Sequence, residues 1–189
     1  GQLSPLEKVH EAIFASGMTR SGGFSTYEVM DQNDPTLVVT SVLMFIGGGS
    51  GSTAGGIKVT TLAVLLLAIL AEIRGDEHIQ VHHREISSSL VRVAVAVVTA
   101  GALLVLTAVV ALTAVTDQGI TVATFEALSA FGTVGLSTGL TASAPEAGQW
   151  ILIVLMFVGR VGIITLAAGL AARSTPTFYR YPTERPIIG

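Results

Sequence analysis

Residues 90 to 116 form one apolar stretch whose single charge, Arg92, stands near its start. A helix needs about 20 consecutive apolar residues to cross the hydrocarbon core of a bilayer, and this stretch is longer than that. Residues 149 to 172 form a second such stretch, interrupted by Arg160. Charged residues make up 12% of the chain, about half of their share in a typical soluble domain. The sequence therefore predicts an all-α membrane protein.

A third apolar region, residues 36 to 71, is broken in its middle by small residues. The run GGGSGSTAGGIK occupies residues 47 to 58, between TLVVTSVLMFI and VTTLAVLLLAILA. Each glycine lowers helix stability by about 1 kcal/mol relative to alanine. The run therefore predicts a mobile loop inside a broken membrane helix, with its free amides and hydroxyls facing water.

The chain contains an internal repeat. Two pairs of segments match at one offset of 112 residues: VLMFIG (42–47) with VLMFVG (154–159), and GFST (23–26) with GLST (135–138). Two matches at the same spacing indicate duplicated units. The sequence therefore predicts two copies of one membrane unit.

Each copy begins with a short helix that cannot span a bilayer. EAIFA at 11–15 matches EALSA at 126–130 with an offset of 115 residues, and the helices around them are expected at about 5–17 and 121–131. A helix of this length fits a re-entrant segment. The turns that follow, 19–26 and 132–138, are then expected at a water-filled pore.

These turns carry the residue types of a cation filter. Such a filter replaces the water around a cation by main-chain carbonyl oxygens, and glycine reaches the backbone conformations that align them. Thr133, Val134 and Gly135 resemble the start of the potassium-channel filter TVGYG, and Ser21, Gly22 and Gly23 occupy the same positions in the first copy. We expect K⁺ to bind only at the carbonyl oxygens of these six residues.

The loops differ in charge. The connection 72–89 and the residues after 172 carry arginines, whereas the connections 27–35, 117–119 and 139–148 carry acidic residues and neither Lys nor Arg. By the positive-inside tendency, 72–89 and the C-terminus are expected on the cytoplasmic side of the cell membrane.

Five segments together resemble the Trk/Ktr/HKT family of potassium transporters, and within it the KtrB type. They are RSGGFST (20–26), MFIGGGSGSTAGGIKVTT (44–61), TVGLST (133–138), MFVGRVG (156–162) and YRYPTERPIIG (179–189). Members of this family build a pseudo-fourfold pore from four helix, pore-loop, helix repeats. The resemblance implies a pore-forming subunit of a potassium uptake system, and not an enzyme.

The resemblance divides the chain into four parts. Residues 1–73 match the third repeat without its first helix, 74–89 a cytoplasmic connector, 90–172 the fourth repeat, and 173–189 a cytoplasmic tail. Two filter strands cannot close a ring of four. We therefore expect the missing repeats in the N-terminal part of a longer chain; the alternative is that they lie on another chain.

The resemblance assigns a gate to two elements. The first is an intramembrane gating loop formed by Gly47, Gly48, Gly49, Ser50, Gly51, Ser52, Thr53, Ala54, Gly55 and Gly56. The second is Arg160, which would project into the pore below the filter and repel cations. An intramembrane charge must face protein or water. The alternative is a structural ion pair, with Glu11 or Glu126 as partner.

The resemblance also implies partners. These are a second copy of the chain, membrane lipid, and a cytosolic nucleotide-binding subunit of the RCK type. A nucleotide is expected only on that subunit, and no nucleic acid is expected. K⁺ is the expected ion, with Na⁺ left open.

Competing interpretations remain at three places. The glycine run lacks the Gly-Lys-Ser/Thr sequence of a phosphate-binding loop, but it fits a close helix crossing as well as a gate. Lys58 fits either a pore-lining or a snorkelling role, and His78, His82 and His83 either a metal cluster or a solvated connector. For the whole chain, the alternative function is a non-conducting membrane assembly or regulatory protein that retains half of this fold.

Overall fold

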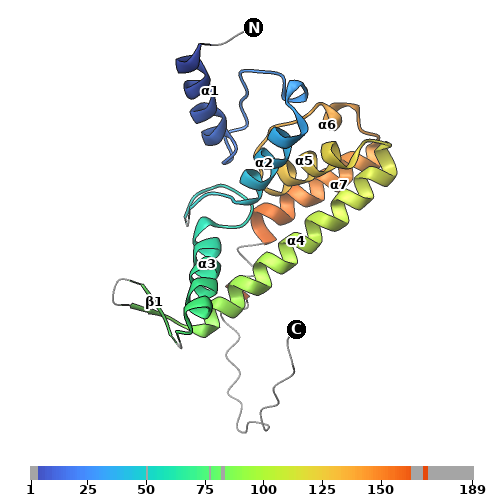
Figure 1. The fold of residues 1–189 in the computed structure, drawn as a ribbon. Helices are drawn as coiled ribbons and strands as arrows, with labels where there is room; N and C mark the ends of the chain where they lie inside the picture. The colour runs from blue at the N-terminus through green and yellow to red at the C-terminus, as the bar shows by residue number, and fades with distance from the viewer. Residues whose placement is uncertain (1–3, 50, 77, 82–83, 163–167, 170–189) are drawn as a thin grey trace.

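The computed structural model describes residues 4–49, 51–76, 78–81, 84–162 and 168–169. Ser50, His82, His83, the predicted tail 173–189 and most of the predicted span beyond 162 lie outside these ranges. Seven α-helices and one hairpin make up the described part (Figure 1): α1 Pro5–Met18, α2 Asp34–Phe45, α3 Val59–Arg74, β1 Ile79–Val81, β2 Arg84–Ile86, α4 Ser88–Thr116, α5 Ile120–Phe131, α6 Leu140–Ser143 and α7 Glu146–Phe157.

The bounds of the helices follow the internal repeat. α2 begins at Asp34 and ends at Phe45, and α7 begins at Glu146 and ends at Phe157, so both ends are offset by the same 112 residues as the sequence motifs. The short helices expected near 5–17 and 121–131 form as α1 and α5. The third apolar region is broken as predicted, into α2 and α3.

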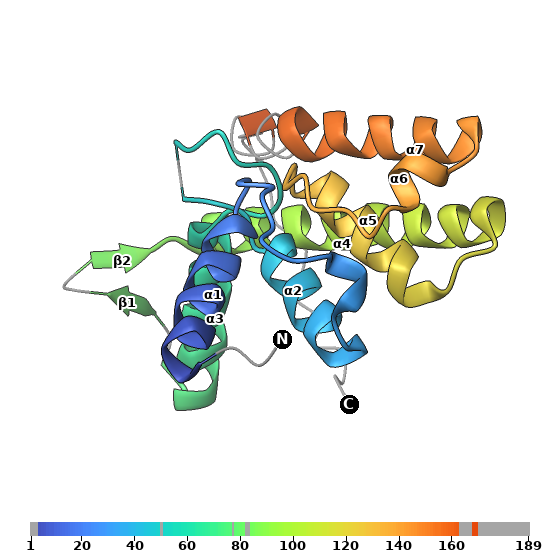
Figure 2. The same cartoon turned by 90° about the horizontal axis from the view of Figure 1, so that it is seen from above.

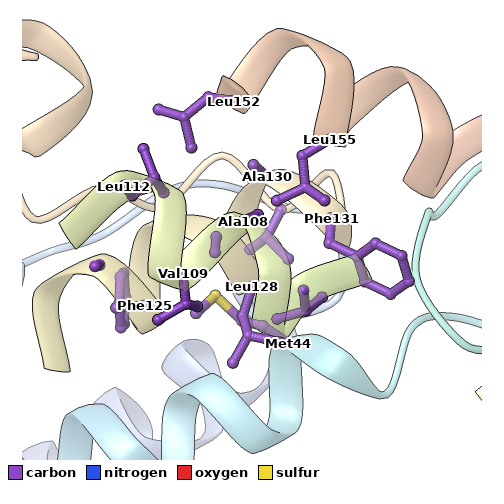
Figure 3. Packing of buried hydrophobic residues seen from close by; sticks show 14 of the residues in the cluster. Met44, Ala108, Val109, Leu112, Phe125, Leu128, Ala130, Phe131, Leu152 and Leu155 are labelled. Atoms are coloured by element: carbon purple, nitrogen blue, oxygen red, sulfur yellow. The ribbon is translucent and has the colours of Figure 1, made fainter. Parts of the chain in front are cut away.

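The short helix α5 lies at the centre of the fold. α2, α4 and α7 surround it (Figure 2), and eight of its residues, from Ala123 to Phe131, are buried. Figure 3 shows side chains of α2, α4, α5 and α7 packed in one buried cluster, among them Met44, Leu112, Leu128, Phe131 and Leu155. By contrast, α1 has no buried residue. The second half-helix is therefore held inside the core, and the first lies at its edge.

Among the described residues, α4 is the one helix long and apolar enough to cross a membrane. Its most apolar 18-residue window has a mean hydropathy of 2.7. One face packs on α3, α5 and α7, and exposed Leu103, Leu106 and Val110 lie elsewhere on its surface. Exposed apolar side chains on such a helix fit contact with lipid.

The connector between α3 and α4 forms an antiparallel hairpin, which the sequence did not lead us to expect. Ile79 pairs with Ile86 and Val81 with Arg84. His78 Nδ1 lies 3.0 Å from Glu85 Oε1, with both side chains exposed. Within the described ranges no three His, Cys, Asp or Glu side chains gather as a metal site would require; two members of the proposed histidine cluster fall outside them.

Candidate functional site

The two predicted pore turns share one unusual backbone pattern. In the first turn (residues 21–23), Ser21 has φ +67° and Gly23 φ +70°; in the second turn (residues 133–135), Thr133 has φ +50° and Gly135 φ +94°. Positive φ is uncommon for residues with a side chain. Its presence at Ser21 and Thr133, equivalent positions of the repeat, shows that both turns adopt the same left-handed conformation at alternate residues.

The two turns lie in direct contact although they are far apart in sequence. Ser21 Oγ donates a hydrogen bond of 2.8 Å to the main-chain oxygen of Thr133. A Cβ added at Gly23 would lie 2.6 Å from the main-chain oxygen of Val134 and 3.3 Å from the Cα of Gly135. Only glycine fits at position 23. The structure thus brings all six predicted filter residues into one place.

The second turn is anchored to the end of α5. Val134 N donates to the main-chain oxygen of Ser129 over 2.9 Å, and Ser129 Oγ donates to the main-chain oxygen of Leu136 over 2.5 Å. The C-terminal end of a helix carries a partial negative charge. The second turn therefore follows the helix end that attracts cations.

Each half-helix also carries a glutamate that binds the segment after its turn. Glu126, 2% exposed, accepts hydrogen bonds from Ser137, Thr138 and Thr141. Glu11 accepts one from Thr26 Oγ1 over 2.7 Å. The alternative that pairs Glu11 or Glu126 with Arg160 is wrong: no ion pair joins Arg160 to either residue in the described part of the chain. Hydroxyl groups of the same repeat donate hydrogen bonds to these carboxylates instead.

The base of the glycine loop is closed by main-chain hydrogen bonds. Gly47 N donates to the oxygen of Ile57 over 2.8 Å, Ile57 N to that of Phe45 over 3.2 Å, and Val59 N to that of Gly48 over 3.3 Å. The Phe45 ring stacks on Phe131 at the end of α5, with centroids 5.8 Å apart. The two ends of the loop, at the end of α2 and the start of α3, are thus bonded to each other and lie next to the end of α5.

One side of the glycine loop packs against the second repeat. Gly55 N donates to Thr133 Oγ1 over 2.9 Å, and Gly56 N donates to the main-chain oxygen of Gly159 over 3.3 Å. Residues 54–57 are buried, whereas Gly49 and residues 51–53 are exposed. The expectation that the loop amides face water is therefore wrong for Gly55 and Gly56, because the second turn and the residues just after α7 provide their acceptors.

The side chain of Lys58 turns back onto the glycine loop, and a pore-lining or snorkelling role for it stays a prediction. Its Nζ donates to the main-chain oxygen of Ala54 over 2.6 Å and to that of Ser52 over 3.3 Å. Lys58 therefore ties the glycine loop to the start of α3.

Arg160 lies where α7 loses its regular α-helical form. Residues Val158–Gly162 form a π-helical segment, and π-bulges occur often at functional sites. In the repeat, Arg160 aligns with Gly48, so the π segment of the second copy stands where the first copy has its glycine loop. A Cβ added at Gly159 would overlap the main-chain oxygen of Phe131. The close approach of the π segment to the end of α5 therefore requires glycine there.

Arg160 and the second turn border the same cavity. It measures about 550 Å³ and is lined by twelve residues, among them Thr133, Gly135, Ser137 and Arg160. The sequence predicted that Arg160 and Gly135 lie on one ion pathway. It did not predict that Glu126 binds the segment after the turn, although Glu126 is the first residue of the repeated segment EALSA.

Comparisons with known proteins agree with this geometry. The family described as TrkH, cation transport protein, matches residues 1–176. The chain is 38% identical over 178 residues to the Ktr system potassium uptake protein D of Bacillus subtilis, which covers 94% of the chain and 40% of that protein. It is 37% identical over 189 residues to the Ktr system potassium uptake protein B of the same organism, covering 100% of the chain and 42% of the relative.

A solved structure shares the fold. The crystal structure of the potassium transporter TrkH from Vibrio parahaemolyticus matches with a TM-score of 0.75 at 27% identity, over 95% of this chain and 40% of that one. The chain thus spans about two fifths of the relatives that it matches. The predictions of an all-α membrane fold and of a cation transporter family, rather than an enzyme family, are confirmed. The chain belongs to the TrkH family of cation transport proteins.

Proposed function

We propose that the chain forms half of a potassium-conducting pore, with the turns 21–23 and 133–135 as two of its four filter strands. One observation carries this proposal: two turns from different repeats touch through Ser21 and Thr133 and share positive φ at equivalent positions. Alternation between left-handed and ordinary conformations turns successive carbonyl groups to one side of the strand. A row of such oxygens can replace the hydration shell of K⁺.

The gate in this proposal consists of the glycine loop 47–56 and Arg160. The loop reaches the second turn through the hydrogen bond from Gly55 N to Thr133 Oγ1, and it carries positive charge at its end through Lys58. Arg160 borders the cavity that the second turn also lines. Cations that leave the filter would meet both charges, so opening requires the loop and the arginine to move away.

The whole protein, in this proposal, is a potassium uptake subunit of the cell membrane. The missing repeats complete the ring, a second copy forms a homodimer, and a cytosolic RCK-type subunit that binds nucleotide acts on the cytoplasmic side. The hairpin after α3 and the C-terminal residues would face that side. The names of the Ktr relatives, which place them in potassium uptake systems, support the presence of partner subunits.

Uptake of ⁸⁶Rb⁺ tests the proposal. The full-length protein that carries this chain is expressed in a bacterial strain without its own potassium uptake, and K⁺ and Na⁺ are added as competitors. We expect Rb⁺ uptake that excess K⁺ suppresses more strongly than Na⁺. Membrane insertion with no uptake, alone or with its cytosolic partner, would contradict the proposal and favour the non-conducting alternative.

A further inference from the structure

The carboxylate of Glu126 is the most densely hydrogen-bonded side chain in the described part of the fold. Its Oε1 accepts from Ser137 Oγ at 2.6 Å, Thr138 N at 2.7 Å and Thr138 Oγ1 at 2.9 Å. Its Oε2 accepts from Thr141 Oγ1 at 2.7 Å. All four partners donate, as an ionised carboxylate requires. Donors in this number offset the cost of burying the charge.

The donors lie just after the second turn, where the row of oxygens must end. Ser129 Oγ holds the main-chain oxygen of Leu136 over 2.5 Å, so that oxygen points back toward α5. Gly135 is then the last residue of the turn whose oxygen accepts no such hydrogen bond, while that of Thr133 accepts one from Ser21 Oγ. The next residues, Ser137 and Thr138, are held by Glu126. The position of Gly135 is thus fixed from its C-terminal side by one buried carboxylate.

The first repeat contains a weaker version of the same contact. Glu11 aligns with Glu126, and Thr26 aligns with Thr138. Thr26 Oγ1 donates to Glu11 Oε2 over 2.7 Å at the surface, whereas the Thr138 hydroxyl and amide both donate to Glu126 inside the core. The recurrence at equivalent positions indicates that the carboxylate belongs to the architecture of the turn rather than to one local packing arrangement.

We propose that Glu126 is a positioning residue that sets the ion selectivity of the pore by holding the Gly135 carbonyl in place. The proposal rests on the function proposed above. Na⁺ is smaller than K⁺, so the filter oxygens must move inward to coordinate it. A turn anchored by four hydrogen bonds to a buried charge resists that movement. Without the anchor, the oxygens relax around Na⁺, and discrimination between the two ions falls.

Three variants of the full-length protein test this role. Glu126→Gln keeps the shape of the side chain but has one acceptor oxygen. Thr141→Val keeps the volume and removes the donor to Oε2. Glu146→Gln, at the exposed start of α7 and outside these contacts, is the matched control. The readouts are the Na⁺ concentration that halves ⁸⁶Rb⁺ uptake and the amount of folded protein in the membrane.

We expect Glu126→Gln to lower the half-inhibiting Na⁺ concentration about tenfold, and Thr141→Val to lower it about threefold, as the loss of hydrogen bonds to a charged group predicts. Glu146→Gln should match the wild type. If the Glu126→Gln protein does not accumulate in the membrane, the Na⁺ inhibition of Thr141→Val alone tests the proposal. Unchanged Na⁺ inhibition, even with lower Rb⁺ uptake, would make Glu126 merely structural and overturn the inference. Absence of uptake in the wild type would instead overturn the proposed function.

Discussion

Ser21 Oγ donates a hydrogen bond of 2.8 Å to the main-chain oxygen of Thr133, the residue that stands at the same position in the other repeat. The contact joins two turns that are 112 residues apart. It also leaves the Thr133 hydroxyl available to Gly55 of the glycine loop. One residue of the second turn therefore links the other turn on one side and the proposed gate on the other.

Gly135→Ser tests the second turn as a filter strand. Gly135 has φ +94°, where a residue with a Cβ is strained by about 1 to 2 kcal/mol. We expect the strain to displace the neighbouring carbonyl groups and to weaken the preference of uptake for K⁺ over Na⁺. Competition of ⁸⁶Rb⁺ uptake by each ion measures this preference.

Gly75→Ser is the matched control for that variant. Gly75, which follows the end of α3, also has a positive φ, +73°, and open space around the position of a Cβ. It therefore carries a similar backbone cost outside the turn. Equal losses of selectivity in the two variants would show that backbone strain, rather than the filter position, causes the effect.

Thr133→Val tests the contact between the glycine loop and the second turn. The variant keeps the shape of the side chain but leaves the buried Gly55 amide without its acceptor, which costs about 1 to 3 kcal/mol. We expect the loop to leave its closed position more often and uptake to rise. Thr133→Ser keeps the hydroxyl and should retain the wild-type rate. A rise in both variants, or in neither, would rule out this hydrogen bond as a gate contact.

Arg160→Ala tests the proposed electrostatic barrier. A unit charge about 10 Å from a cation, at an effective dielectric constant of about 20, raises its energy by about 1.7 kcal/mol. Removal of the charge should raise the maximal rate of ⁸⁶Rb⁺ uptake about tenfold. Arg160→Lys keeps the charge and should stay near the wild-type rate. Slower uptake by Arg160→Ala than by Arg160→Lys would contradict the barrier.

Gly159→Ala tests the close approach of the π segment, Val158–Gly162, to the end of α5. A methyl group at this position would overlap the main-chain oxygen of Phe131, and overpacking of this kind costs about 1 to 3 kcal/mol. We expect a lower midpoint of thermal unfolding in detergent. Gly169→Ala, with open space around the added Cβ, should unfold like the wild type. Equal midpoints for the two variants would mean that the helices separate easily at Gly159.

The internal repeat made most of the fold predictable. Because motifs recur at an offset of 112 residues for α2 and α7 and of 115 residues for the half-helices, the positions of these helices follow from aligning the chain with itself. The break between α2 and α3 follows from its glycines. The sequence did not predict the hairpin at 79–86, because each of its strands is only three residues long. Such short strands form through pairing with each other rather than through a strong local residue pattern.

The side-chain contacts of the site were less predictable. From the sequence, Glu126 is a candidate ion-pair partner for Arg160, since two opposite charges in apolar segments are expected to pair. The structure instead surrounds it with hydroxyl and amide donors from its own repeat, which satisfy a carboxylate equally well. Lys58 likewise binds carbonyl oxygens of its own loop. Such pairings depend on the path of the turns in space, which the order of residues alone does not specify.

Anomalous diffraction from the full-length protein grown in Rb⁺ tests the central claim most directly. The account predicts an ion peak beside the main-chain oxygens of residues 21–23 and 133–135 that excess K⁺ removes. Ion density elsewhere in the membrane region, with these oxygens turned into packed protein, would contradict it.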